Sequence, residues 1–207
     1  MATDLRIPTD TERASRRPGV VGVLLAGGAG TRFRGDHHKL LTPFKGRPLY
    51  RWGLDAVLDA GLAALIVTGA IESFSDLPDG VSTRHNPRWA EGMATTLAVA
   101  VEYARSVAAT AIVVGPADQP LIPSDAWREL AEVSGPICVA TYDGRRANPV
   151  RLEAEVWALL PSTGDFGARE LIRMRPDLVT EVACRGNPAD IDTREDHDRW
   201  NSSTNSP

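Results

Sequence analysis

Short runs of β-branched and other apolar residues alternate along the chain with longer segments in which apolar residues recur at helical spacing. The predicted elements are, in order, a strand over 20–26, a helix over 48–60, strands over 63–68 and 81–85, a helix over 93–107, a strand over 110–115, a helix over 124–133 and a strand over 136–142. Strands that alternate with helices are typical of βαβ units. The pattern therefore predicts an α/β domain with a doubly wound parallel sheet.

The order of elements changes beyond Tyr142. There the pattern predicts a short apolar run over 149–152, a helix over 153–160, a turn at Gly164 and Asp165, a helix over 168–173 and a strand over 178–184. We interpret this part as a substrate-facing extension of the same domain and not as a second domain.

Size and composition limit the function classes. With 207 residues, of which 43% are hydrophobic, the chain is long enough for one domain with a complete core. We expect that domain over 19–200, with disordered tails over the polar segments 1–18 and 201–207. The net charge of −4 argues against nucleic acid and membrane surfaces as partners. No apolar run is long enough to cross a membrane, and a polar arm stands where a signal sequence would be, so a cytoplasmic location is expected.

The cysteines and histidines show no metal-binding pattern. Cys138 and Cys184 lie in apolar, strand-like segments without C-x-x-C spacing, and we expect buried reduced thiols. His37 and His38 are neighbours in the sequence, and we expect a solvated loop pair there. These residues give no reason to predict a zinc site.

A glycine-rich loop follows the first predicted strand. It reads Gly27-Gly28-Ala29-Gly30-Thr31-Arg32, and Lys39 follows it along the chain. Glycines allow positive φ and let backbone N–H groups approach an anion, while the two cations bring positive charge to the same place. The loop matches neither the dinucleotide fingerprint nor the P-loop. It is typical of a phosphate site, with Arg32 and Lys39 as its charged members.

Carboxylates follow two other predicted strands. Asp118 comes after the strand over 110–115, and Asp190 and Asp192 come after the last strand. Ligands of an open parallel sheet bind beyond the carboxyl ends of its strands, so these residues are expected near the glycine loop. Carboxylates beside a phosphate site favour a Mg²⁺ ion between them. Two other interpretations stay open: Asp118 starts a turn, or Asp192 caps the helix that begins near Arg194.

Seven short motifs occur in a fixed order over nearly the whole predicted domain. They are Leu25-Ala26-Gly27-Gly28 with Arg32 and Lys39, Gly46-Arg47-Pro48-Leu49, Asn86-Pro87-x-Trp89-x-x-Gly92-Met93, Asp118-Gln119-Pro120-Leu121, Asn148-Pro149-Val150, Gly164-Asp165-x-Gly167-Ala168-Arg169 and Asp190-Ile191-Asp192-Thr193. Together they resemble the MobA/MocA-like nucleotidyltransferases, most closely the molybdenum cofactor cytidylyltransferase branch. Seven ordered motifs are far more specific than any one of them.

The resemblance implies a fold and a reaction. The fold would be a three-layer α/β/α sandwich, a Rossmann-like nucleotidyltransferase fold with a mostly parallel sheet. The reaction would move CMP or GMP from CTP or GTP to the terminal phosphate of molybdopterin, with release of pyrophosphate. A phosphate monoester has its second pKa near ~6, so this nucleophile needs no general base at neutral pH.

The resemblance also assigns roles to residues. Arg32, Lys39 and Asp118 would be catalytic, and Mg²⁺ would bind Asp118 with help from Asp190 or Asp192. Residues implied to bind the nucleotide are Leu25, Ala26, Gly27, Gly28, Gly30 and Thr31, with Asn86, Gly92 and Met93 near the base and ribose. Residues implied to bind the acceptor are Arg146, Asn148, Gly164, Asp165, Gly167 and Arg169. A molybdoenzyme or its maturation chaperone would be a further partner.

Several alternatives stay open. The loop reads Ala26-Gly27-Gly28, as in the guanylyl branch, whereas cytidylyl enzymes more often show Ala-Ala-Gly, so the base is not fixed. The spacing from Arg32 to Lys39 is longer than in the common loop of the family. Other functions to weigh are a non-catalytic nucleotide-binding accessory protein for molybdoenzyme maturation, a nicotinamide-dependent reductase, and transfer to another small phosphorylated acceptor.

Overall fold

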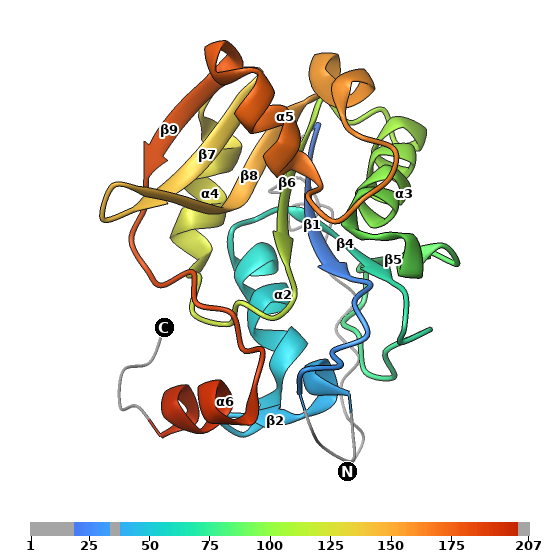
Figure 1. Cartoon of the computed structure of the whole chain (residues 1–207), viewed down its shortest axis with the longest axis vertical. Coiled ribbons are helices and arrows are strands. Elements are labelled where there is room, and N and C mark those ends of the chain that lie inside the picture. The colour runs from blue at the N-terminus through green and yellow to red at the C-terminus, as the bar shows by residue number, and fades with distance from the viewer. Residues whose placement is uncertain (1–18, 34–37, 203–207) are drawn as a thin grey trace.

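The computed structural model of the chain describes residues 19–33 and 38–202 (Figure 1). The tail predicted over 1–18, most of the one predicted from residue 201, and His37 lie outside the described residues. The strands are β1 (Val20–Ala26), β2 (Pro43–Phe44), β3 (Arg47–Pro48), β4 (Ala63–Thr68), β5 (Ser82–His85), β6 (Ala111–Pro116), β7 (Ile137–Tyr142), β8 (Arg145–Glu153) and β9 (Val179–Ala183). The α-helices are α2 (Leu49–Asp59), α3 (Met93–Ser106), α4 (Ser124–Glu132), α5 (Ala168–Met174) and α6 (Arg194–Asn201).

Seven strands form the central sheet in the order β5-β4-β1-β6-β8-β7-β9. All neighbouring pairs are parallel except those of β8, which runs antiparallel to both β6 and β7. The predicted mostly parallel sheet is therefore confirmed, with one reversed strand near its centre.

Strand β8 corrects the interpretation of the segment after Tyr142. Residues 149–152 do not belong to an extension, because they form the second half of β8 inside the sheet. The turn that reverses the chain is made by Asp143 and Gly144, which have φ values of 50° and 74°. Positive φ at both positions suits the tight two-residue turn of a hairpin.

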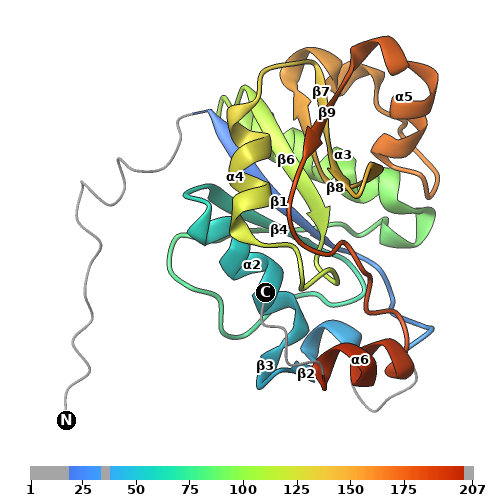
Figure 2. The same ribbon diagram turned by 90° about the vertical axis from the view of Figure 1, so that its left-hand side faces the viewer.

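Helices cover both faces of the sheet, as Figure 2 shows from the side. Helices α2 and α4 pack with one set of strand residues, and α3 and α5 pack with the other set. In β1, for example, Leu24 belongs to the first cluster and Val23 to the second. Successive side chains of a strand point to opposite faces, so a strand covered on both faces reads as a continuous apolar run. The three-layer α/β/α fold is confirmed.

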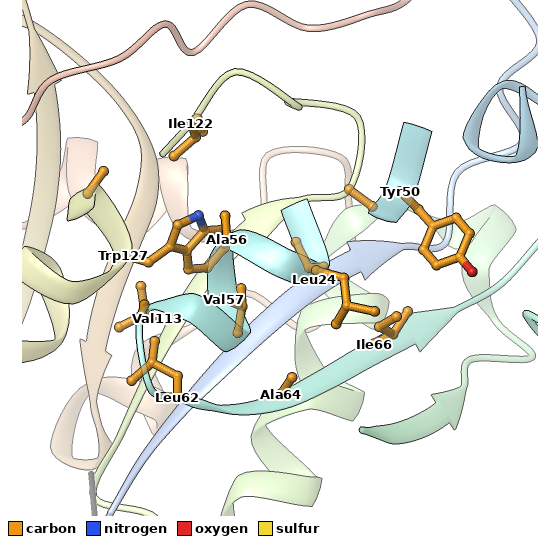
Figure 3. Packing of buried hydrophobic residues seen from close by; sticks show 14 of the residues in the cluster. Leu24, Tyr50, Ala56, Val57, Leu62, Ala64, Ile66, Val113, Ile122 and Trp127 are labelled. Carbon is orange, nitrogen blue, oxygen red and sulfur yellow. The ribbon is translucent and has the colours of Figure 1, made fainter. Parts of the chain in front are cut away.

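The first cluster is the larger part of the core (Figure 3). Leu24, Ile66 and Val113 from three neighbouring strands pack against Val57 of α2 and Trp127 of α4, and all five side chains are at most 1% exposed. Helix α6 stands apart from the sheet, beside the small β2–β3 hairpin. There the backbone N–H of Lys45 donates to Asn201 Oδ1 at 2.6 Å.

The predicted helix over 153–160 is a 3-10 helix, Ala154–Leu159. The other 3-10 turns are Lys39–Leu41, Trp89–Glu91 and Pro176–Leu178. Within residues 19–33 and 38–202, no helix is both long enough and apolar enough to cross a membrane.

Candidate active site

A cavity of about 410 Å³ opens beyond the carboxyl ends of β1 and β6. The glycine loop forms one side, the start of α3 forms another, and charged side chains from three distant segments complete it. We name it the nucleotide cavity, after its glycine loop. Its lining residues are Leu25, Ala26, Gly27, Gly28, Ala29, Gly30, Thr31, Arg32, Lys39, Leu40, Trp89, Ala90, Gly92, Met93, Thr96, Pro116, Asp118, Asp165 and Asp192.

The glycine loop is held by close backbone contacts. The backbone N–H of Ala70 donates to the Gly27 carbonyl oxygen at 3.1 Å. A Cβ atom placed on Gly69 would lie 2.5 Å from that same oxygen and 2.6 Å from the Cβ of Trp89. Gly69 thus permits the end of β4 to touch the glycine loop, and it is a positioning residue that the sequence patterns did not single out.

Lys39 joins the carboxylates of two distant segments. Its Nζ lies 2.5 Å from Asp118 Oδ2 and 2.7 Å from Asp192 Oδ1, and Arg32 Nη1 lies 3.0 Å from Asp192 Oδ2. Burial alone would lower the pKa of Lys39, but the two carboxylates raise it above its usual value. The expected proximity of Asp118 to the glycine loop is therefore present in the structure.

Asp118 retains an unused oxygen. Its Oδ1 is buried and has no hydrogen-bond partner within the described part of the chain. Asp190 is bound by the residue after Asp118, because Gln119 Nε2 donates to Asp190 Oδ1 at 2.8 Å. Burial, followed by the charge of Asp118, raises the pKa of Asp190. Asp192 does not cap α6, because the cap is Thr193, whose side chain accepts from the backbone N–H of Asp196.

A second cavity of about 240 Å³ adjoins the first. The two share Leu25, Arg32, Met93, Pro116, Asp118 and Asp192. We name the second one the acceptor cavity, after the acceptor site that the resemblance implies for Asn148 and Arg169. It adds Leu97, Val114, Gly115, Asn148, Val150, Phe166, Ala168, Arg169, Ile172 and Asp190. Asp118 and Asp192 therefore lie where a molecule in one cavity would meet a molecule in the other.

Some sequence-predicted site residues lie outside both cavities. Arg146 pairs with Glu181 on the surface, with 2.7 Å between Nε and Oε1. Asn86 is only 2% exposed, and its Nδ2 donates to Thr95 Oγ1 and Thr96 Oγ1 at 2.9 and 3.0 Å. Asn86 thus fixes the start of α3, which borders the nucleotide cavity, without lining the cavity itself.

The loop before α5 packs on the same helix start. The backbone N–H of Ala94 donates to the Gly164 carbonyl oxygen at 2.9 Å, and a Cβ on Gly167 would lie 3.2 Å from Met93 Sδ. Gly164 and Gly167 shape this loop without lining either cavity, whereas Asp165 lines the first and Arg169 the second.

Two functional candidates were missed by the sequence patterns. His38 is not a solvated loop residue: its Nε2–H donates to the Gly28 carbonyl oxygen at 2.9 Å, and its Nδ1 accepts from the backbone N–H of Leu40 at 3.2 Å. Burial lowers the pKa of His38. Gln119, only 5% exposed, links the acceptor cavity to the Asp118 loop. Gln119 belongs to one of the quoted motifs, but no local signal gives either residue a role, because their partners are fixed only by the tertiary fold.

Within residues 19–33 and 38–202, no group of three His, Cys, Asp or Glu side chains is arranged to hold a metal ion. The carboxylates of Asp118 and Asp192 do converge on one cation, the Lys39 ammonium, and Asp118 Oδ1 is free. Mg²⁺ in nucleotide sites uses one or two carboxylates together with phosphate oxygens. This donor set fits a divalent ion that arrives with a nucleotide.

Comparison with known proteins agrees with this geometry. Residues 22–181 match the MobA-like NTP transferase domain. The chain is also 33% identical over 135 residues to a molybdenum cofactor guanylyltransferase of Xanthomonas euvesicatoria, an alignment that covers 65% of this chain and 66% of that protein. The fold and its paired cavities thus define a nucleotidyltransferase. The chain belongs to the MobA-like NTP transferase domain family.

Solved structures share the fold over nearly their whole length. Rv0371c of Mycobacterium tuberculosis superposes with a TM-score of 0.76 at 28% identity, covering 89% of this chain and 98% of that one. A manganese complex of the same mycobacterial protein gives a TM-score of 0.70 at 25% identity, covering 90% and 100%. A nucleotidyl transferase of Methanothermobacter, at 21% identity and a TM-score of 0.74, covers 89% and 98% and shows the fold alone.

Proposed function

We propose that the chain transfers GMP from GTP to the terminal phosphate of molybdopterin. The observation that carries the proposal is the pair of adjoining cavities with Asp118 and Asp192 in common. A phosphate oxygen of the acceptor attacks the α-phosphorus of GTP and forms the new P–O bond. The bond from the α-phosphorus to the bridging oxygen breaks, and pyrophosphate leaves with the electron pair.

GTP is favoured over CTP by the curated relative and by the glycine loop. The relative is named a guanylyltransferase. The loop keeps glycine at position 27, where a Cβ atom would lie 2.7 Å from Thr96 Oγ1, so an Ala-Ala-Gly loop would not fit here without a shift of Thr96. Arg32 and Lys39 bring positive charge to the loop. They would bind the β- and γ-phosphates, where negative charge grows as pyrophosphate departs.

The lining of the acceptor cavity supports a planar organic acceptor that carries phosphate. Phe166 and Met93 line it while remaining 67% and 44% exposed, which leaves an aromatic ring and a thioether available to a flat molecule. Arg169 supplies a cation for a phosphate in the same cavity. Molybdopterin combines a flat pterin with a phosphate, and it is the acceptor implied by the family.

A divalent ion such as Mg²⁺ would be held by Asp118 and Asp192. When bound, it neutralises charge shared by the two phosphate groups. Asp192 is preferred to Asp190 as the second ligand because both Asp118 and Asp192 already share the Lys39 ammonium, whereas Asp190 is bound by Gln119. We also expect a cytoplasmic location and delivery of the product to a molybdoenzyme or its maturation chaperone.

The proposal is tested by measuring pyrophosphate release from the purified protein with Mg²⁺, molybdopterin and each NTP in turn. We expect the highest kcat/KM with GTP. Asp118→Asn should lower it by about two to three orders of magnitude, because a carboxylate that would hold the divalent ion is lost. Asp125→Asn is the matched control, since Asp125 lies exposed on α4 and pairs with Arg128.

Each result of this assay has a definite meaning. GTP binding without pyrophosphate release would overturn the proposal in favour of a non-catalytic accessory protein. A clear preference for CTP would correct the base. Release with another phosphorylated compound and none with molybdopterin would correct the acceptor.

A further inference from the structure

Gln119 follows Asp118, which lines both cavities, and makes three side-chain hydrogen bonds. Its Nε2 donates to Asp190 Oδ1 and to the Pro188 carbonyl oxygen, both at 2.8 Å. Its Oε1 accepts from Asn148 Nδ2 at 3.2 Å. The residue is only 5% exposed, so these bonds replace contacts with water.

The orientation of the amide follows from the chemistry of its partners. A carboxylate and a carbonyl oxygen can only accept, so the side of Gln119 that faces Asp190 and Pro188 must be the NH₂ group. The opposite side must then be the oxygen, which requires Asn148 to donate. The row Asn148, Gln119 and Asp190 therefore has one direction of donation along its whole length.

The three bonds connect segments that are far apart in the sequence. Asn148 belongs to β8, Gln119 follows β6, and Asp190 lies in the segment before α6. Backbone bonds dock that last segment on the Asp118 loop: Ile191 N–H donates to the Asp118 carbonyl oxygen at 3.0 Å, and Asn187 N–H donates to the Leu121 carbonyl oxygen at 3.2 Å. Gln119 is the side chain that joins this docked pair of segments to β8.

Asn148 and Asp190 both line the acceptor cavity, and neither lines the nucleotide cavity. We propose that Gln119 is a positioning residue for the acceptor, holding Asn148 and Asp190 in place on the wall of the second cavity. The proposal rests on the proposed function, because it takes the second cavity as the acceptor site. It goes further by naming a residue that controls binding of one substrate and not of the other.

Two variants separate this role from a general role in folding. Gln119→Glu keeps the shape but places an acceptor oxygen against Asp190 and the Pro188 carbonyl, whereas Gln119→Leu removes all three bonds. Leaving a buried polar group unpaired is costly, so Asn148 and Asp190 should leave their places on the cavity wall in both variants. We therefore expect the KM for molybdopterin to rise roughly tenfold or more. The KM for GTP should stay within about twofold, and the glutamate variant should be the worse of the two.

A spectroscopic arm is available because Gln119 is the only glutamine of the 207-residue sequence. Protein labelled with ¹⁵N in the glutamine side chain gives a single pair of amide proton signals that needs no assignment. In the ligand-free protein these protons should exchange slowly with water, and Asp190→Asn should shift them. Adding molybdopterin should shift them further, whereas GTP with Mg²⁺ should change them little.

The outcomes are distinguishable. A selective rise in the molybdopterin KM together with a protected amide supports the proposal. Equal changes in both KM values, or a KM for molybdopterin unchanged in both variants, would overturn it even if transfer is normal in the parent protein. If the parent protein transfers nothing to molybdopterin, the proposed function fails and the acceptor role of Gln119 fails with it. A fast-exchanging amide that ignores Asp190→Asn would independently refute the hydrogen-bonded row.

Discussion

The two cavities are built in different ways. Much of the nucleotide cavity comes from one continuous stretch, the end of β1 and the loop 27–32, where Gly27, Gly28 and Gly30 present only backbone atoms. The acceptor cavity takes side chains from β6, β8, α3, α5 and the segment before α6. Backbone in a glycine loop suits phosphate groups that all NTPs share, whereas side chains from separate segments can vary independently. From this comparison we infer that differences in the acceptor, as distinct from the nucleotide, would arise in the second cavity.

The largest effect is expected where the cavities meet, at Lys39. Lys39→Met removes the ammonium that Asp118 and Asp192 share, so we expect kcat/KM for GTP to fall by about three orders of magnitude. With no ammonium between the two carboxylates, Mn²⁺ should bind the ligand-free variant more tightly than the parent protein, as measured by calorimetry. Weaker Mn²⁺ binding in the variant would contradict the placement of the metal at this pair.

Gly69→Ala tests the backbone construction of the nucleotide cavity. The new Cβ would lie 2.5 Å from the Gly27 carbonyl oxygen, and backbone cannot yield as a flexible side chain can. We expect a loss of unfolding free energy of about 1–3 kcal/mol and a clear rise in the KM for GTP. In denaturant unfolding, Gly28→Ala is the matched control, because a Cβ there meets no atom within 4 Å. Equal unfolding midpoints for the two variants would argue against the close contact.

Phe166→Ala probes the side-chain construction of the acceptor cavity. The ring is 67% exposed and lines that cavity, so its removal should leave the melting temperature nearly unchanged. The KM for molybdopterin should rise by about five- to tenfold through loss of ring contact, with the KM for GTP unaffected. Leu159, 46% exposed and outside both cavities, provides the control variant Leu159→Ala. A Phe166→Ala effect no larger than the control would mean that the ring does not touch the acceptor.

The smallest expected effect is the pH dependence of stability that comes from His38, whose ring bonds to the glycine loop. Burial holds the pKa of His38 below its usual value, so the folded protein favours the neutral ring. The stability from this group is therefore present above pH 6.5 and is lost as pH falls through the lowered pKa. Protonation would also place a proton on Nδ1, which accepts from Leu40 N–H. When the pH falls from 7.5 to 5, the free energy of unfolding should decrease more in the parent protein than in His38→Gln. Denaturant unfolding at the two pH values measures this difference.

Much of the fold was predictable because its signals are local. β1 is covered on both faces and is read directly as an apolar run that ends in glycines. β8 was missed as a sheet strand although Asp143 and Gly144 gave the hairpin signal. Its apolar pattern is interrupted by Arg151, which is 6% exposed and pairs with Glu153 at 2.7 Å. A strand with a buried arginine that pairs with a half-buried glutamate reads, in the sequence, as a surface segment.

The parts of the site that follow parallel strands were also predictable, whereas those fixed by tertiary contacts were not. Asp118 and the glycine loop were expected together because both follow parallel strands, and the carboxyl ends of such strands share one edge. Gln119 could not be given a role from the sequence, since its partners Asn148 and Asp190 lie 29 and 71 residues away. Arg146 looked suitable as a basic residue near a substrate motif, but the structure pairs it with Glu181 of β9, on the other side of β7 from Arg146.

The central claim is that Asp118 and Asp192 lie between nucleotide and acceptor and hold the metal there. The most direct measurement is a crystal structure with Mn²⁺ and a GTP analogue whose α–β bridge cannot be cleaved, using the anomalous signal of manganese. We expect one peak bound by Asp118 and Asp192, with Lys39 turned to the phosphates. A manganese peak remote from Asp118, or a triphosphate that does not touch the loop 27–32, would contradict the account.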